Sequence, residues 1–414
     1  MPSHQKSQVL QLLQGGQAYF PALIKALDEA VSWVQLETYI FDVHGVGAEV
    51  AEALMRAAKR GVTVQVLVDG IGSQELAPDW RQKIMGSGVQ WCVYSPLAAG
   101  LGGWGLLIPD RWRRLHRKLC VIDQRIVFCG GINVLDDFHD PNHGVLQAAR
   151  FDFAVAAMGP LAVEAADAMA LLWWRVQAGY SARQRHLSDA WEQFKAAGYG
   201  GRTDVSRLSD QAKPLPPAAT ALPGTKAVLV LRDNLRNRNS IEKSYRKAIG
   251  RAHHEILIAN AYFLPGGKLR RALIDAARRG VKVTLLLQGK YEYFMQYHAA
   301  RPVYGALLEA GVVIHEYEAS FLHAKVAVID GHWATVGSSN LDPLSLLLAR
   351  EANVVVEDKA FAADLRERLV AAISGHGRCI DPLAYGQRPL GLRIRGILAY
   401  ALMRLAILVT GQRY

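Results

Sequence analysis

The 414-residue sequence has only four cysteines, Cys92, Cys120, Cys129 and Cys379, which lie far apart and form no CxxC pair. Three of them lie in apolar runs typical of strands. The absence of a CxxC pair and the apolar surroundings of three cysteines favour reduced thiols over disulfides. We expect buried, reduced thiols in a protein that faces the cytosol.

The sequence also lacks a long uninterrupted apolar run. Its N-terminal segment, MPSHQKSQVLQLLQGGQAYF, is broken by Gln and Gly and has no small-residue cleavage site, so we expect no secretory signal. The apolar stretch from Ile397 to Val409 contains Arg404 and is shorter than the ~20 residues that cross a bilayer. The basic and apolar tail 379–414 is expected either to attach to a membrane interface or to pack as a helix on the protein body. Its arginines fall on two opposed sides, which does not favour a one-sided amphipathic helix.

What is present is an ordinary globular composition, 51% hydrophobic and 21% charged, which argues against disorder, collagen and a coiled coil. The length allows two or three domains. With 48 Lys and Arg against 37 Asp and Glu, the net charge is +11, which suits anionic lipids and nucleic acids equally.

Four blocks recur in the same order in two parts of the chain. The first part reads VQLETYIF, AAKRGVTVQVLVDG, GSGVQWCVYSP and LHRKLCVIDQRIVFCGGIN, and the second reads ILIANAYF, AARRGVKVTLLLQG, EAGVVIHEYE and LHAKVAVIDGHWATVGSSN. In both, short Val/Ile/Leu runs alternate with helical periodicity, at Val50–Ala58 and Leu269–Ala277, and Gly61 and Gly280 are natural helix stops. The pattern predicts an α/β fold of two homologous halves, each a mixed β-sheet flanked by helices, related by pseudo-twofold symmetry.

We place the first half at residues 1–179 and the second at 227–378. The stretch 180–226 contains DQAKPLPPAATALPGTK and is expected to be a linker, and 379–414 is the tail. The run 168–179, AMALLWWRVQAG, reads as a helix whose Trp173 and Trp174 belong to the core or an interface.

The strongest chemical signal is the motif HxKxxxxD, which occurs once in each half. In a strand, alternation would place its His and Lys side chains on one face, so that an imidazole and an ammonium address the same point. The candidate catalytic residues are His116, Lys118, Asp123, His323, Lys325 and Asp330.

Each motif leads through a second apolar run to an asparagine, Asn133 in GGIN and Asn340 in GSSN. A lysine with an asparagine amide could cradle the nonbridging oxygens of a phosphate. Two such cradles meeting at a pseudo-twofold axis would place imidazoles on opposite sides of one phosphorus, a layout for in-line displacement through a covalent intermediate. Asp123 and Asp330 also suit hairpin turns, VIDQ and VIDG, and turn or ion-pair support is the role we favour for them.

With these motifs, the sequence resembles the phospholipase D superfamily and, within it, the bacterial cardiolipin synthases of the ClsB type. The resemblance covers about Gln8 to Glu357 and rests on LHRKLCVIDQRIVFCGGIN, NAYFLPG and HWATVGSSNLDPLSLLLAREANV. It implies a phosphohistidine mechanism without a metal or other cofactor. In that scheme His116 attacks phosphorus, and His323 protonates the leaving alkoxide and then deprotonates the incoming alcohol. The resemblance also implies that Asp152 and Glu351 each orient the histidine of the other copy.

The superfamily includes nucleases, so the substrate needs a separate argument. An insertion upstream of His116 joins apolar and aromatic side chains to a basic cluster, which fits an anionic membrane better than a nucleic-acid groove, where stacking aromatics would alternate with cations. The expected membrane or headgroup contacts are Trp104, Leu106, Arg111, Arg113 and Arg114.

The expected reaction is phosphatidyl transfer, with two phosphatidylglycerol molecules giving cardiolipin and glycerol, at the cytoplasmic face of the bacterial inner membrane. We expect anionic phospholipids and a membrane surface as partners and no nucleic acid; the oligomeric state stays open. A hydrolytic phospholipase D, another phosphatidyltransferase, a nuclease and an inactive phosphate-binding scaffold are the alternatives. The segment DDFHDPNH, residues 136–143, has loose metal-like spacing, but we expect no metal there.

Overall fold

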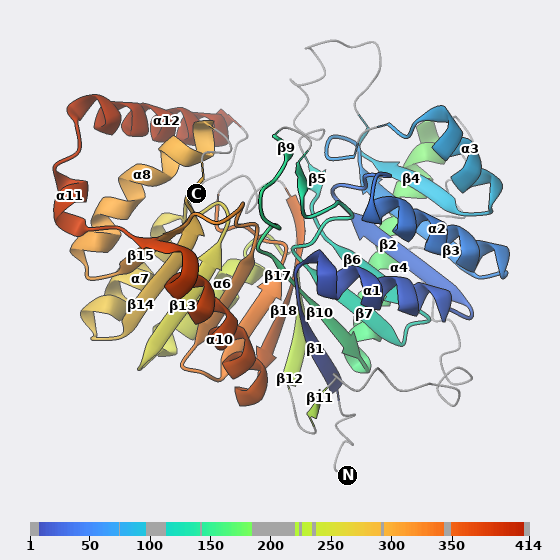
Figure 1. The fold of residues 1–414 in the computed structure, drawn as a ribbon, viewed down its shortest axis with the longest axis horizontal. Helices are drawn as coiled ribbons and strands as arrows, with labels where there is room; N and C mark the ends of the chain where they lie inside the picture. Colours follow the sequence, from blue (N-terminus) through green and yellow to red (C-terminus); the bar gives the residue numbers. More distant parts are fainter. Residues whose placement is uncertain are drawn as a thin grey trace.

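The computed structural model describes residues 8–73, 75–96, 113–140, 143–183, 220–222, 226–233, 237–290, 294–342 and 349–409. Three of the expected membrane contacts, Trp104, Leu106 and Arg111, lie outside these ranges. Figure 1 shows two α/β halves side by side, which meet along a central seam of strands. This is the arrangement that the repeated blocks predict.

The first half is built on a sheet with the strand order β11-β1-β10-β7-β6-β2-β3-β4. Strands β2, β3 and β4 run parallel, joined by helices, and the rest of the sheet is antiparallel. The strands are β1 (Gln8–Gln14), β2 (Trp33–Thr38), β3 (Thr63–Asp69), β4 (Gln90–Tyr94), β6 (Leu119–Ile122), β7 (Ile126–Gly130), β10 (Phe153–Met158) and β11 (Thr220–Leu222). The helices are α1 (Gly15–Asp28), α2 (Val46–Lys59), α3 (Pro78–Gly86) and α4 (Pro160–Arg183), and a small hairpin joins β8 (His139–Asp140) to β9 (Gly144–Val145).

The second half repeats this plan with the strand order β12-β18-β17-β16-β13-β14-β15-β19. Its strands are β12 (Lys226–Arg232), β13 (Glu255–Asn260), β14 (Lys282–Gln288), β15 (Val313–Tyr317), β16 (Lys325–Ile329), β17 (Trp333–Gly337), β18 (Ala349–Glu357) and β19 (Gly377–Cys379). Its helices are α6 (Ser240–Arg251), α7 (Gly267–Arg278), α8 (Phe294–Glu309), α10 (Lys359–His376), α11 (Pro382–Gly386) and α12 (Leu390–Val409).

The helical runs and the glycine helix stops of the two copies lie where the sequence predicts them. Helices α2 and α7 contain the two periodic runs, and each is followed by a glycine with positive φ, 91° at Gly61 and 90° at Gly280. That conformation is strained for residues with a Cβ, so glycine ends both helices cleanly. In the stretch expected to be a linker, α4 continues to Arg183 and β11 pairs with β1, so parts of it belong to the first half.

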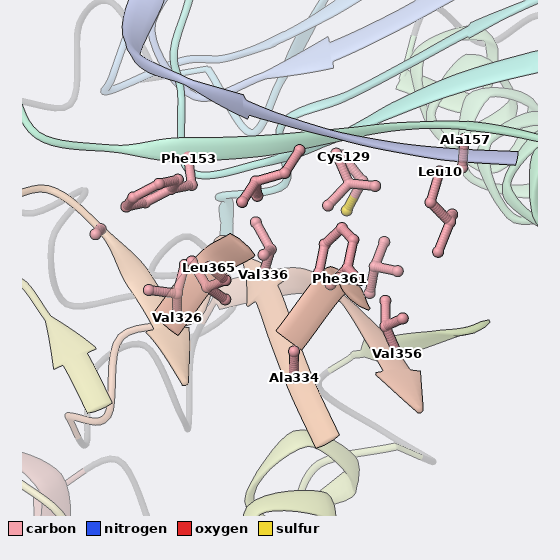
Figure 2. Packing of buried hydrophobic residues seen from close by; sticks show 14 of the residues in the cluster. Leu10, Cys129, Phe153, Ala157, Val326, Ala334, Val336, Val356, Phe361 and Leu365 are labelled. Carbon is pink, nitrogen blue, oxygen red and sulfur yellow. The ribbon is translucent and has the colours of Figure 1, made fainter. Parts of the chain in front are cut away.

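One hydrophobic core joins the halves. It contains Leu10, Cys129 and Phe153 from the first sheet and Val326 and Val336 from the second, all less than 3% exposed. Figure 2 shows these side chains facing each other across the seam, with α10 packed against them. Because each sheet buries one face against the other, neither half could expose that face without losing apolar burial.

Beside this core the two halves exchange short strand pairings. Strand β5 (Arg114–Leu115) of the first half runs parallel to β18 of the second, and Phe151 forms a parallel bridge with Leu322. The backbone N–H of His116 donates to Arg350 O at 3.0 Å, and that of His323 donates to Phe151 O at 2.9 Å. Each motif histidine is therefore fixed by backbone of the opposite half.

This exchange corrects the prediction that His and Lys share a strand. Strand β6 begins at Leu119, after Lys118, and β16 begins at Lys325, after His323. The physical reason is that the chain pairs with the other half at the histidine and joins its own sheet only after that point. The thiol prediction also needs one correction, because Cys92, Cys120 and Cys129 are buried and free whereas Cys379 is free but exposed.

Leu365 tests the shared core. This α10 residue is fully buried against both sheets, so Leu365→Ala should lower the free energy of unfolding by about 2–5 kcal/mol through lost burial and a cavity. Val370→Ala on the same helix is the control, because Val370 is 38% exposed and should shift stability by less than about 0.5 kcal/mol. Denaturant unfolding measures both, and equal effects of the two substitutions would contradict the packing described.

Candidate active site

Each motif histidine is held by a carboxylate from the opposite half. His116 Nδ1 lies 3.0 Å from Glu351 Oε1, and His323 Nδ1 lies 2.6 Å from Asp152 Oδ2. Both carboxylates are buried, and both imidazole side chains are less than one-fifth exposed. When Nδ1–H donates to the carboxylate, the neutral imidazole keeps its lone pair on Nε2, the atom needed for attack or for proton transfer.

Each lysine is tied to its own histidine. Lys118 Nζ donates to His116 O at 2.9 Å, and Lys325 Nζ donates to His323 O. Both side chains are buried, at 3% and 0% exposed. The two ammonium groups therefore lie inside the protein next to the imidazoles, where a buried anion would be their natural partner.

The two motif lysines act electrostatically on both motif histidines. Burial lowers the pKa of His116, which the charge of Glu351 raises in part and the charges of Lys118 and Lys325 lower further. Burial also holds the pKa of His323 well below its usual value, with further lowering by Lys325, Lys118, Arg150 and His116. Because both lysines act on both imidazoles, the four side chains share a single electrostatic environment.

The same burial acts on the other members of the site. It lowers the pKa of Lys118 to about 7, against the opposing charge of Glu351, and raises the pKa of Asp152 to about 6. An anionic phosphodiester entering the site would raise the pKa of each cation and imidazole that it approaches. The charge balance of these buried residues therefore favours an anionic ligand.

Two residues that the sequence analysis missed hold the segments before the histidines. Asp69, at the end of β3, accepts from Leu115 N at 2.7 Å, and Gln288, at the end of β14, accepts from Leu322 N at 3.2 Å. They are equivalent in the two copies, in VLVDG and LLLQG. The sequence does contain a signal for them, since each is a polar residue at the end of a buried strand, at the same place in both repeats.

The two motif aspartates lie in hairpin turns. Asp123 Oδ1 accepts from the backbone of Ser32 and Trp33 at 2.8 and 2.9 Å, and Asp330 Oδ1 accepts from that of His254 and Glu255 at 2.8 and 2.9 Å. Both have positive φ, 52° and 49°. These bonds agree with the turn-supporting role favoured from the sequence, because each carboxylate ties a turn to the start of a neighbouring strand. A direct catalytic role for either aspartate stays an untested prediction.

The two motif asparagines are buried close behind the β7 and β17 strand ends. Asn133 is 9% exposed and its Oδ1 accepts from Ile40 N at 3.2 Å, which leaves its amide N–H groups for other partners. Asn340 is 2% exposed. Their phosphate-binding role remains a prediction.

The pseudo-twofold symmetry is broken next to the carboxylates. Ser338 Oγ donates to Glu351 Oε2 at 2.5 Å, whereas the equivalent position in the first half is Gly131. A Cβ at Gly131 would lie 2.3 Å from Asp152 Oδ1, so that position must be glycine for Asp152 to keep its place. Glu351 Oε2 therefore accepts a hydroxyl hydrogen bond that the glycine at position 131 cannot donate to Asp152.

An aromatic ring adds to this asymmetry. Tyr39 packs edge-on against His116, with ring centroids 5.0 Å apart, and Lys118 Nζ lies 5.4 Å from the centroid of the same ring. The equivalent residue of the second half is Ala261. The sequence strings TYIF and NAYF differ at this position, but only the structure shows that Tyr39 contacts His116.

Arg114 is not the membrane contact that we expected. Its Nη1 lies 3.2 Å from Asp69 Oδ1, its Nη2 donates to Ser95 Oγ at 2.9 Å, and its side chain is only 14% exposed. It reinforces the Asp69 anchor behind His116. Arg113 lies beside it, half-buried.

In the segment 136–143, the described acidic side chains already have protein partners. Asp137 Oδ2 accepts from Gly16 N at 2.5 Å, and Asp140 contacts Arg150 at 2.8 Å and His143 at 3.0 Å. Within the described ranges, no group of three or more His, Cys, Asp or Glu side chains is arranged to hold a metal ion.

Together, two histidines, two lysines and two carboxylates on a duplicated α/β scaffold form a candidate site of the phospholipase D-like kind. A family model described as cardiolipin synthase, PLD-like domain, matches residues 23–147 and 245–372, one stretch in each half. The chain belongs to this family, the cardiolipin synthases with phospholipase D-like domains.

Individual relatives agree with this assignment. Cardiolipin synthase B of Shigella flexneri is 36% identical over 397 residues, which cover 95% of this chain and 87% of the relative. The probable cardiolipin synthase YwiE of Bacillus subtilis is 28% identical over 351 residues, or 84% of this chain and 63% of that protein. Phosphatidylserine synthase of Haemophilus influenzae shares the fold, with a TM-score of 0.66 and 13% identity over 98% of this chain and 97% of its own.

Glu351→Gln tests the cross-half pairing. The amide keeps the size of the side chain but loses the charge that orients His116, so turnover should fall by about 10²-fold or more while the unfolding midpoint is retained. Asp123→Asn is the matched control, because it weakens a turn and should reduce stability while leaving turnover per folded molecule nearly unchanged. Full activity in Glu351→Gln would remove this carboxylate from the mechanism.

The pH dependence tests Asp152. Because burial raises its pKa to about 6, its carboxylate takes up a proton as the pH falls through about 6 and loses the charge that holds His323 Nδ1–H. We expect kcat/KM, which reports the free enzyme, to decline below about pH 6. Asp152→Asn should have lower kcat/KM at pH 8 and lack this decline, and persistence of the same decline in the variant would contradict the assignment.

Proposed function

We propose that this protein is a phosphatidyltransferase that joins two phosphatidylglycerol molecules into cardiolipin and releases glycerol, through a phosphohistidine intermediate. The observation that carries the proposal is the reciprocal pairing of His116 with Glu351 and His323 with Asp152 around two buried lysines. Family membership and relatives named cardiolipin synthase support the choice of reaction.

In the first step, His116 Nε2 attacks phosphorus of the donor lipid and the bond to the glycerol oxygen breaks. Protonated His323 gives its Nε2 proton to that leaving oxygen. Burial and neighbouring cations lower the pKa of His323, and a bound phosphodiester anion would supply the negative charge that lets it hold the proton. Lys118 and Lys325 stabilise the oxygens of the transition state.

In the second step, neutral His323 removes the proton from a hydroxyl of the second phosphatidylglycerol. That oxygen attacks phosphorus, the bond to His116 Nε2 breaks, and cardiolipin is released. We assign attack to His116 because its partner Glu351 is held by a second hydrogen bond, from Ser338 Oγ, and is therefore fixed in position to orient the imidazole of the phosphohistidine.

The substrate class implies a membrane setting. We propose that the enzyme works at the cytoplasmic face of the bacterial inner membrane, as a peripheral protein whose partners are anionic phospholipids. No described helix is long and apolar enough to cross a bilayer.

A phosphodiester with a p-nitrophenyl leaving group separates the roles of the histidines. Nitrophenolate leaves without protonation, so His323→Gln should release about one equivalent of nitrophenolate per enzyme molecule in a burst. The variant should then stall as the phosphohistidine intermediate. His116→Gln should give no burst. A burst from His116→Gln alone would reverse the assignment, and steady turnover in both variants would exclude the covalent mechanism.

Product analysis tests the reaction itself. Purified enzyme with radiolabelled phosphatidylglycerol in detergent micelles should give cardiolipin and glycerol in equal amounts, resolved by thin-layer chromatography. Accumulation of phosphatidic acid in place of cardiolipin would instead assign a hydrolase.

A further inference from the structure

Helix α12 uses one face to pack against α8. At Gly396, a Cβ would lie 3.3 Å from the carbonyl oxygen of His298 and 3.4 Å from Pro302 Cδ, so the two helices approach closely there. Ala399, almost one turn further on, is 3% exposed. This face is covered by the protein itself.

The opposite face of α12 is apolar and exposed. Leu390, Ile394, Ile397 and Leu398 follow the spacing i, i+4, i+7 and i+8, which places them in one stripe, and Leu402 extends it. These five side chains, here called the α12 stripe, are 54–71% exposed. A contiguous apolar stripe of this kind on a protein surface indicates a partner.

The charges beside the stripe identify the partner. Arg393 and Arg395, both exposed, adjoin Ile394 in sequence and so lie on the two margins of the stripe. Helix α12 contains no Asp or Glu, and the whole chain carries a net charge of +11. Apolar side chains bordered by arginines suit the interface of an anionic bilayer. There the apolar side chains enter the acyl region and the arginines contact the headgroups. A second copy of the chain would instead bring like charges together.

The position of α12 agrees with this partner. In Figure 1 it lies along the upper edge of the second half, at the end of the molecule where β5 leads into His116. A membrane on this edge would lie on the same side of the molecule as β5, the strand that precedes His116 in the chain.

We propose that the α12 stripe is a membrane-binding surface that lies in the interface of a bilayer rich in anionic phospholipids. The proposal rests on the proposed function, because a lipid substrate gives the surface its purpose. It also revises the expectation from sequence: the helix packs on the protein body and exposes an apolar face, and its opposed arginines border that face without interrupting it.

Vesicle sedimentation of the full chain tests the proposal. Ile394→Ser with Leu398→Ser should reduce partitioning onto phosphatidylglycerol vesicles about 10-fold or more, because two large apolar side chains no longer enter the bilayer. The matched control, Met85→Ser with Val370→Ser, alters two exposed apolar residues on other helices and should bind like the parent. Arg393→Gln with Arg395→Gln should weaken binding to phosphatidylglycerol vesicles more than to phosphatidylcholine vesicles.

Activity in detergent micelles separates this proposal from the proposed function. All three variants should keep the parent's cardiolipin synthesis there, because the active site is unchanged. Unaltered vesicle binding by the stripe variant, together with normal cardiolipin synthesis, would overturn the membrane-binding proposal and leave the proposed function intact. A change from dimer to monomer on stripe substitution, measured by light scattering, would assign the stripe to a second copy and also overturn the proposal. Absence of cardiolipin from the parent would overturn the proposed function instead.

Discussion

The whole arrangement depends on each histidine being oriented by a carboxylate from the other half of the chain. A histidine that takes its backbone partner and its Nδ1 partner from the opposite repeat cannot reach working geometry in an isolated half. The shared apolar core is the structural condition for this, since it fixes the two sheets face to face. Duplication thus does more than repeat a motif, because each copy supplies residues that complete the site of the other.

The second constraint is the concentration of buried charge. Two ammonium groups, two imidazoles and two carboxylates lie in one buried region, and burial lowers the pKa of both histidines and of Lys118 while it raises that of Asp152. Such an arrangement is costly without a ligand and is relieved by an anion. Small departures from symmetry, Ser338 against Gly131 and Tyr39 against Ala261, then give the two chemically identical imidazoles different surroundings.

Much of this could be read from the sequence, because repetition is a strong signal. The two halves, the mixed sheets, the helix stops at Gly61 and Gly280, and the histidine and lysine candidates all follow from blocks that recur in order. The strand boundaries at the histidines could not be predicted, since they depend on pairing with the other half. The hydrogen bond of Ser338 and the buried role of Arg114 also depend on contacts between distant segments, which local patterns do not encode. Asp69 and Gln288 are marked in the sequence by their equivalent places at two strand ends, but their partners are not.

The central claim is that His116 and His323 act on one phosphorus atom. A crystal structure of the enzyme soaked with tungstate, a heavy analogue of phosphate, tests it most directly through the anomalous signal of the metal. The account predicts a single tungstate whose oxygens or metal lie about 3 Å or less from Nε2 of both histidines, with both lysines in contact. Two tungstate ions in separate sites, each beside one histidine, would contradict it.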